Sequence, residues 1–142
     1  MKKINWILML IVSVTMFALA ACAAAAPAGE PTDVPVTAPY AGMKNPFSGK
    51  ADAAAAGKVI YTDNCATCHG DTGKGDGPGG ASLKVKPADL SEVAANDPDD
   101  RIFWVISVGG EPAGYAADMK PWKDQLSADE IWQTVTYVRS FK

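Results

Sequence analysis

Two cysteines and a histidine lie close together in the segment Cys65-Ala66-Thr67-Cys68-His69. Two thiols three positions apart can each form a thioether bond with one vinyl group of a porphyrin. A histidine directly after the second thiol can then ligate the iron. His69 is the only histidine in the chain, so no other residue can supply an imidazole. The spacing therefore predicts a covalent attachment site for one haem c, held by Cys65, Cys68 and His69.

Other uses of this segment fit the chain less well. A structural zinc site takes four Cys or His ligands, whereas the chain has three Cys and one His, and Cys22 is far from the others in sequence. A thiol–disulfide oxidoreductase without haem would place the Cys65/Cys68 pair in a βαβ pattern, which does not follow here. The oxidoreductase stays an alternative to the haem protein. Alkylation of the two thiols would distinguish the two, because only the protein without haem has free thiols.

The first residues have the pattern of an export signal. Lys2 and Lys3 precede an apolar run from Ile4 to Ala20, which is typical of a signal peptide over residues 1–21. The competing interpretation is a lasting membrane anchor, because the run approaches the lower length limit of a transmembrane helix.

Leu19-Ala20-Ala21-Cys22 resembles the lipobox of bacterial lipoproteins. The resemblance implies cleavage before Cys22 and lipidation of Cys22. An ordinary signal peptide would instead leave a spare thiol, which is a liability in an oxidising compartment. We therefore expect an exported protein, lipid-anchored on the outer (periplasmic) face of the bacterial cytoplasmic membrane.

Residues 22–44 are rich in Ala and Pro and have no helical or strand period, which predicts a flexible tether behind the lipidated Cys22. Some 20 extended residues would reach about 60–70 Å. The folded domain is expected over residues 45–142. The burial of apolar side chains alone gives a domain of this size only marginal stability. A buried haem would supply part of the missing core.

The charge balance argues against nucleic acid as a partner. The chain has 13 Lys and Arg and 16 Asp and Glu; without Lys2 and Lys3, 11 basic residues remain and the net charge is −5. Acidic residues gather between Asp89 and Asp100. We interpret them as a solvated loop with helix-start carboxylates, the alternative being a docking patch for a basic redox partner.

Three helices and no strand are predicted, which makes the fold all-α. The first runs from about Ala53 to Cys65 with Asp52 as N-cap. It contains Gly57, which lowers helix stability and therefore suggests a close approach by another helix. The second covers about residues 98–107. The third begins at a capping box of Ser127 and Glu130 and continues toward residue 141. A short helical turn over 91–95 is also expected.

In this order the motifs are similar to those of a class I (monohaem) cytochrome c domain, over residues 45–142. The matching segments are Gly57-x-x-x-Tyr61, Cys65–Gly70, Gly73–Pro78, Pro87–Leu90, Met119–Trp122, and a last helix with Trp132 and Tyr137. The resemblance implies a fold in which the N- and C-terminal helices cross around a covalent haem. In that fold Gly57 and Tyr61 would meet Trp132 or Tyr137.

The sixth iron ligand is expected to be a methionine, a soft thioether donor. Beyond Cys22 the chain has only Met43 and Met119. Met43 lies before the first helix, whereas Met119 lies in a loop before the last helix, where the family places its distal ligand. The resemblance therefore implies that His69 and Met119 ligate the metal. If neither methionine bound, the open sixth site would indicate a haem-based ligand binder or a peroxidase.

The resemblance also implies that a proline carbonyl accepts the Nδ1–H of His69. Pro78 fits by its Gly-Pro context, and Pro87 is the alternative. Candidates to line the haem or reach a propionate are Trp104, Tyr115 and Trp122. Arg101 is expected to pair either with a propionate or with a neighbouring carboxylate.

The expected function is one-electron transfer rather than catalysis, as a mobile carrier or as a subunit of a larger respiratory or photosynthetic complex. The Asn45-Pro46-Phe47 segment and the lipid anchor resemble those of monohaem subunits of quinol-oxidising assemblies such as alternative complex III. Expected partners are such an assembly or a terminal oxidase, another cytochrome c, or a copper protein.

Overall fold

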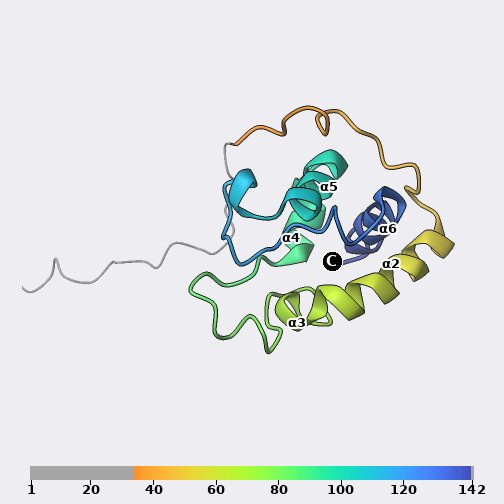
Figure 1. Ribbon diagram of the computed structural model, residues 1–142. Coiled ribbons are helices and arrows are strands. Elements are labelled where there is room, and N and C mark those ends of the chain that lie inside the picture. Colours follow the sequence, from red (N-terminus) through yellow and green to blue (C-terminus); the bar gives the residue numbers. More distant parts are fainter. Residues whose placement is uncertain (1–33, 142) are drawn as a thin grey trace, which may run out of the picture.

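The computed structural model describes residues 34–141, and within them the secondary structure is helical, with no strand. The elements, in chain order, are α2 (Ala51–Asn64), α3 (Ala66–His69), α4 (Leu90–Asn96), α5 (Asp99–Val108), the 3₁₀ helix η1 (Glu111–Ala113) and α6 (Ala128–Val138) (Figure 1). The all-α prediction is confirmed. The predicted signal peptide, Cys22 and the first part of the predicted tether lie outside the described residues.

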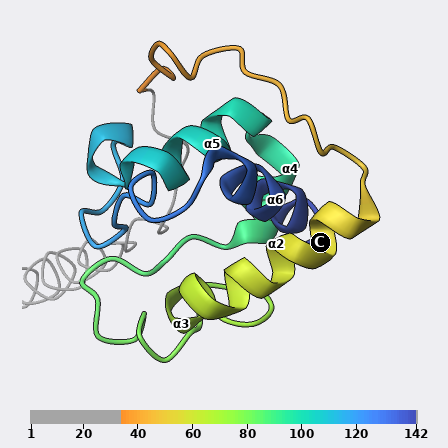
Figure 2. The ribbon, with the colours of Figure 1, turned by 45° about the vertical axis from the view of Figure 1, so that its right-hand side comes forward.

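The first and last long helices, α2 and α6, pack directly against each other (Figures 1 and 2). The two helices approach each other closely at Gly57, because a Cβ at this position would overlap the backbone carbonyl of Gln133. Beside it, the Tyr61 ring lies 5.3 Å from the ring of Tyr137 and 5.3 Å from that of Phe141, measured between centroids. The predicted crossing is therefore present, with Tyr137 and not Trp132 as the aromatic partner.

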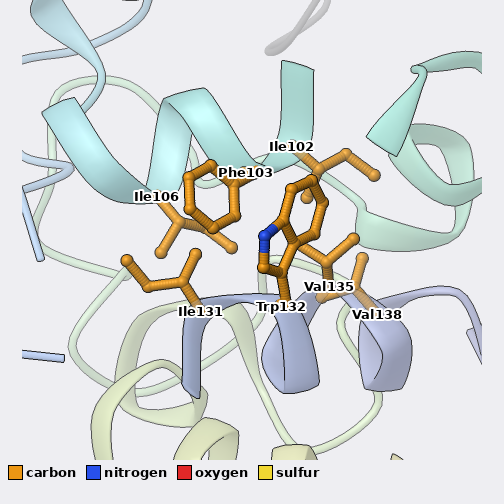
Figure 3. Packing of buried hydrophobic residues seen from close by; sticks show 7 residues of the cluster. All are labelled: Ile102, Phe103, Ile106, Ile131, Trp132, Val135 and Val138. Atoms are coloured by element: carbon orange, nitrogen blue, oxygen red, sulfur yellow. The ribbon is translucent and has the colours of Figure 1, made fainter. Parts of the chain in front are cut away.

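Trp132 instead belongs to the hydrophobic core between α5 and α6 (Figure 3). Its ring stacks on Phe103, with centroids 4.1 Å apart and an interplanar angle of 27°. Apolar side chains of both helices complete the core: Ile102 and Ile106 from α5, and Ile131, Val135 and Val138 from α6. Helix α6 contacts both α2 and α5, and so connects the helix before the attachment motif with the helix after it.

Helix α6 begins as the sequence predicts. Ser127 accepts a hydrogen bond from the Glu130 amide, and the Glu130 carboxylate accepts one from the Ser127 amide, which together form the capping box. Helix α2 differs from its prediction, since Lys50 and not Asp52 occupies the N-cap. Asp52 lies in the first turn, where a carboxylate is favourable near the positive end of the helix dipole.

Residues 34–50, which we call the N-terminal strap, pack on the domain and lead into α2 (Figure 1). The Tyr40 ring lies 6.1 Å from that of Phe103, and Met43 packs against the core. The Gly42 amide donates to Asp100, and the Asn45 side chain donates to Thr136. Residues 34–44 therefore differ from the predicted flexible tether, because Tyr40 and Met43 are partly buried against the core of α5 and α6.

The acidic segment 89–100 mostly stabilises local structure. Asp89 accepts from the Ser91 amide and caps α4. Asp99 pairs with Arg139, whose guanidinium also donates to the carbonyl oxygens of Ala94 and Asp97. These contacts support the interpretation as helix-start carboxylates. Within residues 34–141, none of the helices has the length and apolar character needed to cross a membrane.

Candidate haem site

The two cysteines of the motif lie at a one-turn helix directly after α2. Cys65 is the C-cap of α2 and the N-cap of α3, and Cys68 lies within α3. The Cys68 and His69 amides donate to the Cys65 carbonyl, which closes the turn. Both cysteines are half-buried and neither forms a disulfide. The two unbridged thiols therefore lie within one helical turn of each other along the chain.

The glycine-rich segment after the motif satisfies the carbonyl groups at the end of α3. The amides of Gly75, Gly77 and Gly79 donate to the carbonyl oxygens of His69, Cys68 and Thr67, at 2.8, 3.2 and 2.8 Å. The end of a helix leaves such carbonyls without intrahelical partners. A Cβ at Gly77 would overlap the Thr67 carbonyl, so only glycine allows this approach. The segment thus fixes the backbone of the attachment motif.

The imidazole of His69 is oriented by a backbone carbonyl. Its Nδ1 lies 3.2 Å from the carbonyl oxygen of Ala88, which makes Nδ1 the protonated nitrogen and leaves Nε2 free as a ligand. This corrects the expected partner: the acceptor is the carbonyl of Ala88, and neither Pro78 nor the alternative Pro87. Burial lowers the pKa of His69 despite the opposing hydrogen bond, and so favours the neutral imidazole that a metal requires.

The environment of Cys65 opposes thiol–disulfide exchange. Burial, with a smaller contribution from Cys68, raises the pKa of Cys65 to about 12. The attacking cysteine of a disulfide oxidoreductase needs the opposite, a lowered pKa that provides thiolate at neutral pH. Two unbridged thiols beside a neutral, oriented imidazole are instead the donor set that covalent haem needs. The residues present therefore fit the group.

Met119 lies in a separate segment between α5 and α6, which we call the Met119 loop (residues 109–123). It is half-buried and packs against the core. The Gly110 amide donates to the Met119 carbonyl at 2.8 Å, and Trp122 and Lys123 donate to the carbonyl oxygens of Ile106 and Ser107. The loop is therefore fastened near the end of α5 at Met119 and directly after it.

Met43 has the same kind of packing as Met119 but a different place in the chain. It lies in the N-terminal strap, before α2, and is half-buried against the core cluster of α5 and α6. A contact of this kind is typical of a methionine that fills space between apolar side chains. The two methionines therefore differ in the segment that carries them and not in their contact with the core.

The other predicted lining residues have separate positions. Trp104 is buried and Trp122 is half-buried against the core. The Arg101 guanidinium lies 3.8 Å from the Asp97 carboxylate and donates to the Tyr115 hydroxyl, so Arg101 has the carboxylate partner that the sequence left as one of two options.

Sequence reasoning did not find Ala88 or the role of the glycines, because both act through backbone atoms. It also missed the hydrogen bond from the buried Tyr61 hydroxyl to the Gly70 carbonyl, at 2.6 Å. The regular recurrence of Gly at 73, 75, 77 and 79 was the available signal for a closely packed backbone.

A helical domain whose terminal helices cross, with the Cys-x-x-Cys-His motif on a short helix between them, defines a monohaem class I cytochrome c. Comparison of sequences supports this class. The chain belongs to the family described as cytochrome c oxidase, cbb3-type, subunit III, whose sequence model matches residues 52–138. The domain is accordingly a haem c electron-transfer protein with a single covalent haem.

Among solved structures, the chain is similar to one described as KustC0563 c-type cytochrome. The two are 30% identical, with a TM-score of 0.48, and the match covers 61% of this chain and 96% of that chain. No curated protein sequence matches this chain significantly.

Proposed function

We propose that this protein is an exported, lipid-anchored cytochrome c that carries single electrons in a respiratory or photosynthetic chain. It acts either as a mobile carrier or as a subunit of a larger redox complex. Its partners are a membrane-bound quinol-oxidising assembly or a terminal oxidase, other cytochromes c, or copper proteins. The family's name, which mentions a cbb3-type oxidase, supports the oxidase among these.

In this proposal Cys65 and Cys68 form the thioether bonds, and His69 and Met119 are the axial ligands. The observation that carries it is the contact between His69 Nδ1 and the Ala88 carbonyl, because it reserves Nε2 for the iron. The bound haem supplies a reversible one-electron couple. The chain's own residues orient the imidazole, exclude water and hold a thioether sulfur, which stabilises the ferrous state.

A ligand that fills the sixth position distinguishes an electron carrier from a ligand binder or a peroxidase. Met119 is the methionine whose loop is held by hydrogen bonds to the end of α5, whereas Met43 lies in the N-terminal strap before α2. The attachment of the Met119 loop supports the proposal of a closed, electron-transferring site.

Replacement of each methionine tests the ligand. In the ferric holoprotein, Met119→Ala should abolish the charge-transfer band of methionine–iron ligation and allow CO to bind the reduced form readily. Met43→Ala, the matched control, should keep the band. A band that survives Met119→Ala would refute the assignment, and readily bound CO in the unmutated protein would favour the ligand binder.

The anchor is tested by the mass of the mature protein from native membranes. An N-terminus at Cys22 that carries acyl chains supports the proposal, and an unmodified Cys22 would contradict it. Because the strap packs on the domain from Val34 onward, about 12 residues would separate the lipid from the domain, which limits the reach to about 40 Å. Electron partners would then have to lie close to the membrane surface.

A further inference from the structure

A nearly buried arginine joins three segments of the domain that are distant in sequence. Arg101, at the start of α5, has a side chain that is only 9% exposed. Its guanidinium donates to the Tyr115 hydroxyl in the Met119 loop at 3.1 Å, and to the Val34 carbonyl in the N-terminal strap at 2.8 Å. The guanidinium also lies 5.6 Å from the centre of the Tyr115 ring. One planar cation thus holds the loop and the strap to α5.

The Tyr115 end of this junction is connected to Met119 through the backbone. The Tyr115 amide donates to the Gly110 carbonyl at 2.9 Å, and the Gly110 amide donates to the Met119 carbonyl at 2.8 Å. A Cβ at Gly110 would overlap the Ala116 carbonyl and lie 3.1 Å from the Met119 Cβ. Tyr115 and Met119 therefore pack around the same glycine, so movement of one disturbs the other.

The Met119 loop is attached to α5 at two places, and Arg101 provides the second. Hydrogen bonds to Ile106, Ser107 and Gly110 hold the base of the loop near the end of α5. The tip, at Tyr115, is held by Arg101 from the start of the same helix. Without this second attachment, the tip could open while the base stays in place. Loops can open locally well below the free energy of global unfolding. Here the fully buried Ala113 keeps the first part of the loop on the domain, so the opening concerns the part that follows it, from Tyr115 to Met119.

From these contacts we infer that Arg101 and Tyr115 are positioning residues for the distal ligand Met119. We infer further that the N-terminal strap contributes to this positioning through its contact with Arg101. The inference rests on the proposed ligation by Met119. Arg101 keeps the loop closed and thereby keeps the thioether on the iron. The Val34 carbonyl at the strap end accepts from the same guanidinium, whose Nε also lies 3.8 Å from the Asp97 carboxylate. Strap and loop should consequently open together, through the cation that they share.

The test measures how fast added imidazole replaces the native ligand in the ferric holoprotein. Tyr115→Phe removes the hydroxyl that accepts from Arg101 but keeps the ring, so it should raise the rate of imidazole entry about tenfold, as expected for the loss of a hydrogen bond to a charged group. Arg101→Lys should act in the same direction, because an ammonium group does not reproduce the planar fork. Tyr40→Phe is the matched control, since among the described residues the Tyr40 hydroxyl makes no hydrogen bond and its ring packs on Phe103.

The unfolding midpoint in guanidinium chloride is measured for each variant. A purely structural role would lower the midpoint and leave imidazole entry unchanged, and that result for Tyr115→Phe would overturn the inference. If the unmutated ferric protein lacked the methionine–iron band, the proposed ligation itself would fail, and the inference with it. If the band is present and only the entry rate responds, the inference is supported.

Discussion

The phenol of Tyr61 donates a 2.6 Å hydrogen bond to the carbonyl oxygen of Gly70, the residue that follows His69. Tyr61 is 1% exposed, and its ring lies between α2 and the end of the chain, against Tyr137 and Phe141. The attachment motif is therefore joined by one side chain to the crossing of the terminal helices.

Tyr61→Phe should destabilise the holoprotein by about 1–2 kcal/mol, because it removes a short buried hydrogen bond and leaves the Gly70 carbonyl with the Gly73 amide as its donor. Guanidinium chloride unfolding measures the change. Tyr137→Phe is the matched control: it keeps the ring contact, and its hydroxyl makes no hydrogen bond within residues 34–141, so its effect should stay within about 0.5 kcal/mol. Equal effects of the two substitutions would contradict the role of the Tyr61 hydroxyl.

Gly57→Ala should destabilise the domain by about 1–3 kcal/mol, although alanine favours an isolated helix, because the new Cβ would overlap the Gln133 carbonyl and force α2 and α6 apart. The neighbouring Lys58 is exposed, so Lys58→Ala should change the free energy of unfolding by less than about 0.5 kcal/mol. A Gly57→Ala protein as stable as the parent would show that the helices do not cross this closely.

Haem attachment should depend on two of the three cysteines. Loss of both Cys65 and Cys68 should leave no haem bound covalently, as judged by haem absorbance of the denatured polypeptide, because no thioether can form. Cys22→Ser, the control, should keep the covalent haem if the protein is exported, while losing the lipid. Covalent haem in the doubly substituted protein would refute the attachment site.

Stability should fall at acid pH in part through Asp89. Hydrogen bonds from Ser91 and the nearby Lys74 lower the pKa of Asp89 from 3.8 to about 2. A lowered pKa in the folded state gives a contribution that is present above pH 3.8 and is lost as the pH falls toward 2. Asp89→Asn should therefore be less stable than the parent at pH 7, with a difference that shrinks toward pH 2.

Lys74 is 45% exposed and the Asp89 side chain 30%, so water screens this interaction and the effect should be small. Asp124→Asn, at an exposed position, serves as the control and should behave like the parent at both pH values. A difference between Asp89→Asn and the parent that persists unchanged at pH 2 would show that the carboxylate charge is not its cause.

The sequence alone determined the class of protein, the attachment motif and the order of the helices. Cys65, Cys68 and His69 are recognisable because their chemistry depends on spacing along the chain, which folding does not change. The capping box of Ser127 and Glu130 was likewise predictable, because both partners lie within one helical turn. Gly57 lowers helix stability, and this indicated that another helix crosses α2 there, although the sequence did not show which one.

Only the tertiary structure decided which groups meet across the domain. The acceptor for His69 is a backbone carbonyl, and every residue has one, so no residue type identifies Ala88. The junction at Arg101 joins residues 34, 101 and 115, which have no regular spacing in sequence. The composition of the first part of the strap predicts a tether. In the folded domain, however, Tyr40 and Met43 pack on α5 and α6, because they cover an apolar surface that these helices form together.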